Sequence, residues 1–150
     1  MRVVIQRTQS ASVKIDGKTN GEIGKGLLIL LGIEPSDTQE DVLWLVKKAA
    51  MLRIFDDDEG VMNKSVIDIN GDVMVVSQFT LMASYKKGNR PSYIRAAGPE
   101  IAIPLYDYFC SEMEKTIEKP VKTGVFGANM QVELLNDGPV TICMDSKRKE

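Results

Sequence analysis

An apolar run of eight residues, Gly26–Ile33 (GLLILLGI), restricts most strongly how this chain can fold. It offers no polar side to water, so it predicts a β-strand covered on both faces rather than one with a solvated side. Such a strand needs a layer of structure on each side of its sheet. No longer apolar run occurs, and about 20 residues are needed to cross a bilayer, so we expect no transmembrane segment.

Alternating patterns predict two strands that precede this run. Met1–Arg7 is typical of a strand, and Ser10–Ile15 alternates apolar with polar residues. Asp16-Gly17 then favours a tight hairpin turn, because glycine adopts positive φ at little steric cost. The return strand of this hairpin is expected to end at Gly24.

The clearest alternation covers Asp72–Leu81 and predicts a strand that places Gln78 and Thr80 on the same face. The end of the chain predicts three more strands, the last two joined by Asn136-Asp137-Gly138-Pro139. These strands are expected over Val121–Phe126, Met130–Leu135 and Val140–Met144.

Two amphipathic segments predict helices. Ser36 or Asp37 can begin a capping box ahead of a helix over about Thr38–Arg53, and Pro99 opens a second helix. Because strands outnumber helices about two to one, we predict an α+β fold, a curled, barrel-like antiparallel or mixed β-sheet flanked by two helices. No repeat or linker is present, which favours a single domain over residues 1–150.

The chain has no histidine, and this limits its possible chemistry. A Ser-His-Asp or Cys-His site cannot form, so the usual general base near neutral pH is missing. Any hydrolysis must use backbone donors, a perturbed carboxylate or lysine, or a group of the substrate. The net charge of −2 and pI near 5.3 argue against general DNA binding.

Two cysteines and one acidic segment are the candidates for metal or redox sites. Cys110 and Cys143 fit neither zinc spacing nor a disulfide framework, and we interpret both as small buried hydrophobic residues. Asp56–Gly60 has part of the spacing of a calcium loop, but Ile67 occupies the position that requires a bidentate glutamate. We therefore predict a solvated turn there.

Four blocks of sequence follow one another along the chain, namely Ser77–Leu81 (SQFTL), Lys87–Tyr93 (KGNRPSY), Thr123–Met130 (TGVFGANM) and Asn136–Thr141 (NDGPVT). In this order they resemble the blocks of the D-aminoacyl-tRNA deacylase (D-tyrosyl-tRNA deacylase) family, and Ile5-Gln6-Arg7 and Ala11-Ser12-Val13 fit as well. The resemblance covers essentially the whole chain, and no signature position departs from the family pattern.

The resemblance implies an enzyme that hydrolyses the ester of D-aminoacyl-tRNA during translational proofreading, with no cofactor and no metal. It implies that Gly138-Pro139 has a cis peptide bond and enters the active site of a partner subunit, so the chain would be a homodimer. Arg7 would hold this motif in orientation. The carbonyl oxygens of Gly138 and Pro139 would exclude an L side chain, while a D side chain would point to solvent. Glycyl-tRNA, which has no side chain to exclude, is then expected to be hydrolysed too.

The same resemblance assigns the catalytic site to Ser77, Gln78, Phe79 and Thr80, whose backbone N–H groups could bind the developing oxyanion. Thr80 is a candidate nucleophile, but threonine needs an adjacent base. We therefore favour attack by water assisted by the 2′-hydroxyl of the terminal adenosine, with Gln78 and Thr80 positioning the substrate.

Further residues are expected to contact the tRNA. Phe126 and Met130 correspond to family residues that contact the 3′-terminal adenine, although both could instead be ordinary core residues. Lys86, Lys87 and Arg90 form a basic patch expected to contact phosphates.

Two other functions stay open at this point. The first is a nucleic-acid-binding protein that keeps the fold without catalysis. The second, a metal-dependent hydrolase using Asp56–Glu59, is disfavoured by the lack of histidine and the failed calcium-loop spacing. The absence of a signal-like N-terminal segment predicts a cytoplasmic protein.

Overall fold

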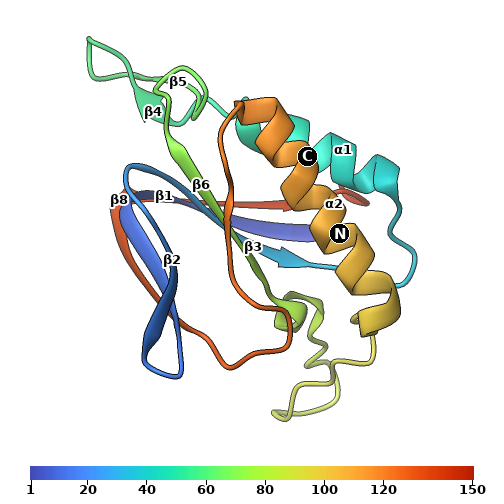
Figure 1. The fold of residues 1–150 in the computed structure, drawn as a ribbon. Helices are drawn as coiled ribbons and strands as arrows, with labels where there is room; N and C mark the ends of the chain where they lie inside the picture. Colours follow the sequence, from blue (N-terminus) through green and yellow to red (C-terminus); the bar gives the residue numbers. More distant parts are fainter.

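A curled six-stranded sheet and two helices on one of its faces make up the computed structural model, which describes residues 1–150 (Figure 1). The sheet has the order β2-β1-β3-β6-β7, and β8 pairs with β1 on its other side. Its strands are β1 (Arg2–Ile15), β2 (Lys18–Ile23), β3 (Gly26–Gly32), β6 (Asp72–Ser77), β7 (Lys122–Thr123) and β8 (Gln131–Asp145). The other elements are α1 (Gln39–Ala50), α2 (Pro99–Ile117), the 3₁₀ helix η1 (Phe79–Met82) and a two-stranded hairpin, β4 (Phe55–Asp56) with β5 (Met62–Lys64).

The long strand β1 curls the sheet because its two halves pair with different neighbours. Residues 2–8 pair with β3, residues 11–15 pair with β2, and β8 follows β1 along almost its whole length. All three pairings are antiparallel, whereas β3 and β6 are parallel. At the far side, the Asn20 side chain of β2 donates to the Thr123 carbonyl of β7 at 2.8 Å, so the curl nearly closes. The prediction of a barrel-like mixed sheet with two helices is confirmed.

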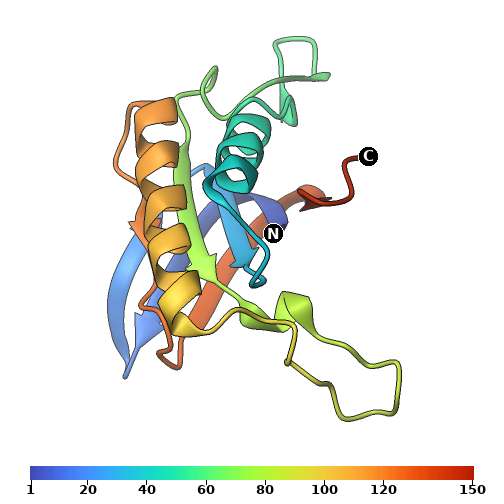
Figure 2. The same ribbon diagram turned by 90° about the vertical axis from the view of Figure 1, so that its right-hand side faces the viewer.

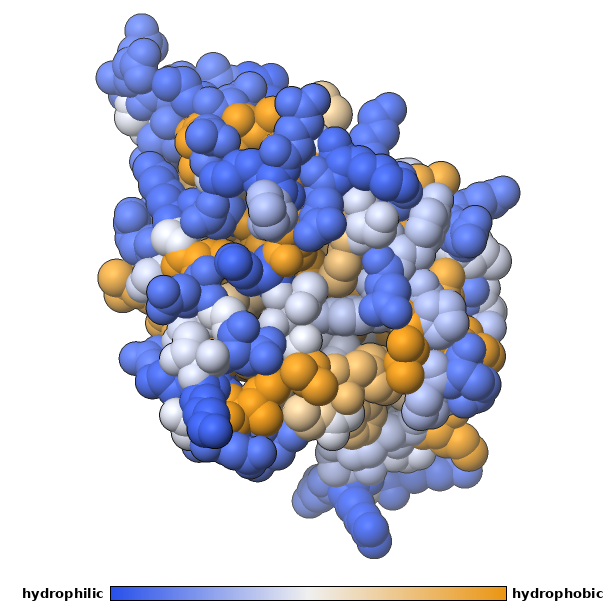
Figure 3. All heavy atoms as spheres, viewed as in Figure 1, coloured by the Kyte–Doolittle hydropathy of each residue, from blue (hydrophilic) through white to orange (hydrophobic).

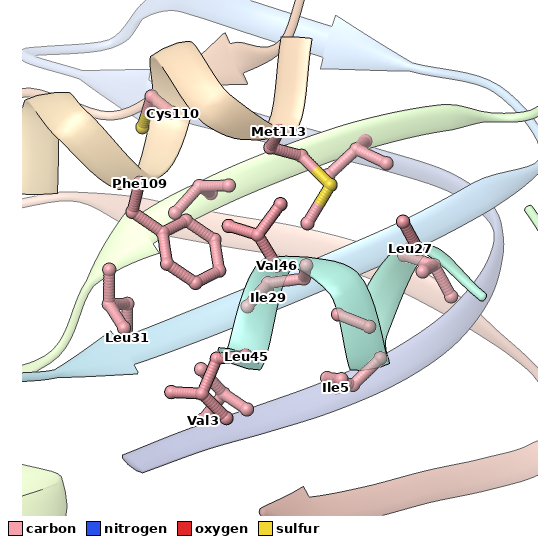
Figure 4. Close-up of a cluster of buried hydrophobic side chains, with 14 of the residues drawn as sticks. Val3, Ile5, Leu27, Ile29, Leu31, Leu45, Val46, Phe109, Cys110 and Met113 are labelled. Atoms are coloured by element: carbon pink, nitrogen blue, oxygen red, sulfur yellow. The ribbon is translucent and has the colours of Figure 1, made fainter. Parts of the chain in front are cut away.

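The apolar run of β3 is buried on both faces, as its sequence predicts. Leu27, Ile29 and Leu31 face the helices and pack with Leu45 of α1 and Phe109 of α2 in the main core (Figure 4). Leu28 points to the opposite, concave side and joins a smaller cluster inside the curled sheet. Complete burial of such a side chain contributes about 1.5 to 3 kcal/mol, so both clusters stabilise the central strand.

Several predicted boundaries are wrong. Met1–Arg7 and Ser10–Ile15 belong to one strand, β1, and the last two predicted strands are one continuous strand, β8. The strand predicted over Val121–Phe126 shortens to β7. Cys110 is buried, but Cys143 is exposed on β8, so only one of the two cysteines behaves as expected.

Helix α1 begins one residue later than predicted and ends three residues earlier. Its N-cap is Thr38, whose backbone N–H donates to Asp41 Oδ2 at 2.9 Å, so neither Ser36 nor Asp37 has the capping role. Lys147 Nζ from the end of the chain donates to the same oxygen at 2.8 Å. Burial opposes the ionisation of Asp41, but hydrogen bonds from Lys147, Ser146 and Thr38 outweigh it and hold the pKa of this carboxyl well below its usual 3.8.

We expect Asp41→Asn to lower the free energy of unfolding by about 1 to 3 kcal/mol at pH 7, because it removes a hydrogen-bonded charge. The pKa of Asp41 is lower in the folded than in the unfolded chain. Its stabilisation is therefore present above about pH 4 and is lost as the pH falls toward the folded-state pKa. Urea unfolding at pH 7 and pH 3 should show a difference that shrinks in acid. Glu40→Gln, one residue earlier on the same helix, is the control, and an equal loss from it would contradict the prediction.

Candidate active site

The segment that follows β6 leaves the sheet earlier than its alternating pattern predicts. Gln78 makes the last ladder bond, from its backbone N–H to the Leu31 carbonyl at 2.7 Å. Residues 79–82 then wind into η1 instead of continuing the strand to Leu81. The 3₁₀ helix packs directly on the end of β3, where a Cβ on Gly32 would lie 2.8 Å from Leu81 Cβ. Glycine at this position lets η1 approach the sheet so closely.

Gln78 and Thr80 meet in η1, although they do not share a strand face. Gln78 Nε2 donates to Thr80 Oγ1 at 2.5 Å. Phe79, between them, is 55% exposed and lies edge-on to Tyr93, with ring centroids 5.0 Å apart. The hydroxyl of Thr80 is therefore paired with an amide, which is no base at neutral pH.

The start of η1 also presents free backbone donors. Its first internal bond runs from Leu81 N–H to the Gln78 carbonyl at 3.2 Å. The N–H groups of Phe79 and Thr80 precede that bond and have no acceptor within the 3₁₀ helix. Two adjacent donors of this kind can bind an oxygen that gains negative charge.

The predicted adenine contacts lie beside the last residues of β6. Gly124 N–H donates to the Val75 carbonyl at 3.3 Å, and the Tyr106 hydroxyl donates to the same carbonyl at 2.8 Å. Phe126 lies edge-on to Tyr106, with ring centroids 6.4 Å apart. Burial raises the pKa of Tyr106, which keeps its hydroxyl a neutral donor. This segment is thereby fixed within two residues of Ser77.

Met130 approaches the same place from the other end of the segment. A Cβ on Gly124 would collide with Met130 Sδ, so glycine leaves the space that this side chain occupies. Phe126 and Met130 are each half-buried, and they pack against the main core and the smaller cluster, respectively. Figure 3 shows apolar atoms gathered over the lower part of this face, where η1 and the segment between β7 and β8 lie.

Gly138 and Pro139 interrupt the regular pairing of β8 and are both exposed. Their peptide bond is cis, as the family resemblance implies, and Gly138 has φ +129°. Asn136 bridges the interruption: its Oδ1 accepts from Val140 N–H at 2.9 Å, and its Nδ2 donates to Gln6 Oε1 at 2.6 Å. The motif is thus held from inside its own strand and from β1.

Arg7 lies directly under this motif and is almost completely buried. Its Nε donates to the Asp137 carbonyl at 2.9 Å, and its Nη1 donates to the Ile54 carbonyl at 2.5 Å. The carboxylates of Asp56 and Asp137 lie 3.4 and 3.5 Å from the guanidinium. The sequence analysis gave Ile54, Asp56 and Asn136 no role in holding this motif, because no periodic pattern links residues so far apart in the chain.

The two halves of the expected site do not meet within one chain. Arg2 Nη1 donates to the Leu81 carbonyl at 3.1 Å, so Arg2 marks the half of the site that contains η1. Arg7 bonds to Asp137, next to Gly138, so Arg7 marks the other half. Arg7 follows Arg2 by five positions along β1, and at about 3.3 Å per residue their Cα atoms are roughly 17 Å apart. Gly138-Pro139 and the Gln78–Thr80 segment are therefore attached near opposite ends of this stretch of β1.

The basic residues occupy a loop that projects from the body of the molecule (Figure 2). Backbone hydrogen bonds between Ser84 and Ser92, both 2.8 Å long, close the base of this loop. Lys86, Lys87 and Arg90 are exposed, and none of them forms an ion pair in the chain. Their charge is available to an anionic partner.

The acidic segment Asp56–Gly60 forms the turn of the β4–β5 hairpin, as predicted. Asp57 accepts from the backbone N–H groups of Glu59 and Val61 at 3.0 Å each, and Asp58 pairs with Lys64 at 2.9 Å. These carboxylates are thus bonded within the hairpin.

Comparison with known proteins gives consistent matches over the full length. A model of the family described as D-Tyr-tRNA(Tyr) deacylase matches residues 4–145. The proteins named D-aminoacyl-tRNA deacylase of Parabacteroides distasonis and Bacteroides thetaiotaomicron are 64% and 62% identical to this chain, with 100% of both chains covered in each case.

Two solved structures are also similar. One, named c-Myc DNA Unwinding Element Binding Protein, has a TM-score of 0.91 and 42% identity, over 97% of this chain and 98% of that one. The other, described as a probable eukaryotic D-amino acid tRNA deacylase, has a TM-score of 0.81 over 95% of this chain and 97% of that one. At 18% identity the second match supports the fold alone. Neither α1 nor α2 combines the length and apolar character needed to cross a membrane.

Proposed function

Because the chain belongs to the D-Tyr-tRNA(Tyr) deacylase family, we propose that it proofreads translation by hydrolysing D-aminoacyl-tRNA at sites that two copies of the chain complete together. As a D-aminoacyl-tRNA deacylase it is a hydrolase, and its substrate is aminoacyl-tRNA. The products are the free D-amino acid and the tRNA. We expect it to act in the cytoplasm, where aminoacyl-tRNA is used.

The strongest support for ester hydrolysis is the pair of free backbone N–H groups at Phe79 and Thr80. When water attacks the ester carbonyl, its oxygen becomes negatively charged, and these two donors would stabilise it. Each donor of this kind contributes about 3 to 4 kcal/mol in other acyl-transfer sites. Ser77 ends the strand that precedes these donors, and Gln78 orients the Thr80 hydroxyl by donating a hydrogen bond to it.

The attacking water needs a proton acceptor that the chain does not supply at this place. Thr80 Oγ1 is paired with the Gln78 amide, and the chain contains no histidine. The vicinal 2′-hydroxyl of the terminal adenosine lies next to the ester in every aminoacyl-tRNA. It can accept a hydrogen bond from the attacking water and donate one to the departing 3′-oxygen, so that the proton lost by the water ends on the leaving group. Gln78 and Thr80 then position the substrate rather than attack it.

The terminal adenine would bind against Phe126 and Met130. Both belong to the segment that Gly124 bonds to Val75 of β6, and both retain partial exposure. Stacking on such a surface contributes about 1 to 3 kcal/mol per base, enough to fix one flexible nucleotide.

Chiral selection would come from Gly138 and Pro139 of the second copy. Their exposed backbone is held from below by Arg7, so the carbonyl oxygens are fixed obstacles. An L side chain would collide with them, whereas a D side chain would point to solvent. Glycine has no side chain to collide, so glycyl-tRNA should also be cleaved.

The separation of the two ends of the site within one chain supports a homodimer. If the twofold axis of such a dimer passes near the middle of residues 2–7 of β1, the Arg2 end of one copy lies beside the Arg7 end of the other. Gly138 of one copy then faces η1 of the other copy. The helices leave this face of β1 and β8 uncovered. A groove of about 920 Å³ borders it, lined by Val4, Leu81 and Cys143 and also by Trp44 and Lys48 of α1. Sedimentation at micromolar concentration should show a dimer, and a monomer would remove the shared site.

The function is tested by the hydrolysis of matched D- and L-tyrosyl-tRNA by the purified protein, with and without a chelator. We expect rapid release of D-tyrosine, intact L-tyrosyl-tRNA and no effect of the chelator. Glycyl-tRNA in a parallel reaction tests the glycine proposal. If neither tyrosyl ester is cut, the chain is instead a binding protein on a deacylase fold.

Salt dependence tests the basic loop. Alanine at Lys86, Lys87 and Arg90 together is expected to weaken tRNA binding and to flatten the plot of log KM against log salt concentration by about 2 to 3 units, close to one for each phosphate that is no longer neutralised. The matched control replaces three exposed lysines that have no ion-pair partner, namely Lys18, Lys25 and Lys47. An equal flattening in both variants would remove the loop from the surface that binds tRNA.

DNA binding is the second candidate function, favoured by the 42% identical solved structure, which is named as a protein that binds a DNA unwinding element. The net charge of −2 disfavours it for this chain, because non-specific DNA binding depends on positive charge. Saturable binding of duplex DNA by a protein that leaves D-tyrosyl-tRNA intact would support this alternative.

A further inference from the structure

The Arg7 guanidinium connects Gly138-Pro139 to a part of the molecule that lies outside the active-site sequence blocks. Its Nε bonds to the Asp137 carbonyl, one residue before the motif. Its Nη1 bonds to the Ile54 carbonyl and lies 3.4 Å from Asp56 Oδ1. Ile54 leads into the β4–β5 hairpin and Asp56 lies within it, so the guanidinium bridges this hairpin and β8.

The hairpin is a fixed support. Phe55, at its base, is 1% exposed and packs in the main core. Its turn is bonded through Asp57, and Arg53 Nε donates to the Asn63 carbonyl at 2.9 Å across its two strands. In Figure 1 it extends past the end of the sheet, close to the bend of β8. A group held by this hairpin therefore has a defined position.

The guanidinium has no free space on the side of the motif. A Cβ on Gly138 would lie 3.0 Å from Arg7 Nη2, so the guanidinium leaves too little room there for a methyl group. A shift of the guanidinium must then move Gly138 or open a gap beneath it. The position of the motif consequently depends on what holds the other side of the guanidinium.

Two carboxylates, those of Asp56 and Asp137, balance this buried charge from opposite sides. A buried arginine requires such partners, because an unpaired charge is costly away from water. Without Asp56 the guanidinium would be drawn toward Asp137, which belongs to the segment that must stay in place. Asp56 is 53% exposed, so its ion pair adds little to overall stability.

We propose that Asp56 is a positioning residue for chiral selection: its carboxylate holds Arg7, and Arg7 holds Gly138-Pro139 at the distance that excludes L side chains. This inference rests on the proposed function. It assigns part of the specificity to the β4–β5 hairpin, which would act on the active site of the partner copy.

The test compares Asp56→Ala and Asp56→Asn with the wild type in the hydrolysis of D- and L-tyrosyl-tRNA. We expect the ratio of D to L rates to fall by about tenfold or more in Asp56→Ala, since a displacement near 1 Å in a positioned group can change rates by up to 100-fold. Asp56→Asn keeps an acceptor oxygen but not the charge, so its ratio should fall less. Asp56→Asn also tests the proposal if the Asp56→Ala protein does not fold.

Asp58→Ala is the matched control, because Asp58 lies in the same hairpin but pairs with Lys64 instead of Arg7. A purely structural role for Asp56 would lower both rates alike and leave their ratio unchanged. An unchanged ratio in both Asp56 variants, with a selective wild type, overturns this inference alone. A wild type that cuts neither ester overturns the proposed function instead.

Discussion

Hydrolysis of D-tyrosyl-tRNA is expected to slow by about 10²- to 10⁴-fold when the terminal adenosine lacks its 2′-hydroxyl, which is the range that a positioned proton-transfer group contributes. The reason lies in the surroundings of η1. Thr80 Oγ1 is bonded to the Gln78 amide, and no histidine exists anywhere in the chain. The substrate hydroxyl is then the group best placed to direct water at the ester.

The experiment uses tRNA that ends in 2′-deoxyadenosine and carries D-tyrosine on its 3′-oxygen. Single-turnover rates with this substrate and with the ribose form are compared, each corrected for its hydrolysis without enzyme. The deoxy substrate should still compete with the normal one for binding, which shows that only the chemical step is affected. Full activity on the deoxy substrate would rule out assistance by the 2′-hydroxyl.

A Thr80→Val variant separates the two chemical hypotheses further. Valine keeps the shape of threonine but has no hydroxyl, so a nucleophilic Thr80 would leave almost no activity. If Thr80 only positions the substrate, we expect the rate to fall by about tenfold, comparable to the loss of one hydrogen bond. This variant therefore tests the role of the side chain while the backbone donors of η1 remain.

The fold class could be predicted because its main determinants are local. The two-sided burial of Gly26–Ile33 and two amphipathic helices already require a sheet with a helical layer. The end of β6 could not be predicted in this way. The alternating pattern continues to Leu81, but the neighbouring strand β3 ends at Gly32. Residues after Gln78 therefore have no strand beside them to form backbone hydrogen bonds with, and they form η1 instead.

The interruption of β8 is a second feature that the local sequence did not predict correctly. Asn136–Pro139 has the composition of a turn, and we predicted two strands joined by it. In the structure the residues on both sides of it pair with the same strand, β1, so the chain continues in one direction and the interruption becomes an irregularity within β8. The choice between a turn and an irregularity depends on long-range pairing.

The candidate site was predictable only as a set of residues. The sequence blocks contain Gln78, Thr80 and Gly138, but their spacing along the chain does not show that η1 and the motif are attached near opposite ends of residues 2–7 of β1. The bridge from Asp56 to Arg7 spans 49 residues and leaves no local signal. Contacts of this kind are decided by packing, which a single sequence does not display.

Gly138→Ala is expected to reduce the ratio of D to L hydrolysis by about 10²-fold, the loss typical of a positioned group displaced by about 1 Å. The added Cβ would lie 2.9 Å from Val140 Cγ2 and 3.0 Å from Arg7 Nη2. Arg7 cannot give way easily, because it is buried and bonded to the Asp137 and Ile54 carbonyls. The backbone of Gly138 must therefore move, and with it the carbonyl oxygens that are proposed to exclude L side chains.

The matched control is Gly17→Ala in the turn between β1 and β2. Gly17 also has positive φ, at +75°, but a Cβ there would have no atom within 4 Å. Gly17→Ala has the backbone strain of the left-handed region, about 1 to 2 kcal/mol, without the collision, whereas φ +129° at Gly138 adds further strain to the collision. Both variants are assayed on D- and L-tyrosyl-tRNA after their thermal unfolding has been compared. If a folded Gly138→Ala protein keeps the wild-type ratio of D to L hydrolysis, the position of this glycine does not set the chirality of the reaction. If the ratio falls in Gly138→Ala but not in Gly17→Ala, chiral selection is located at the Gly138-Pro139 motif.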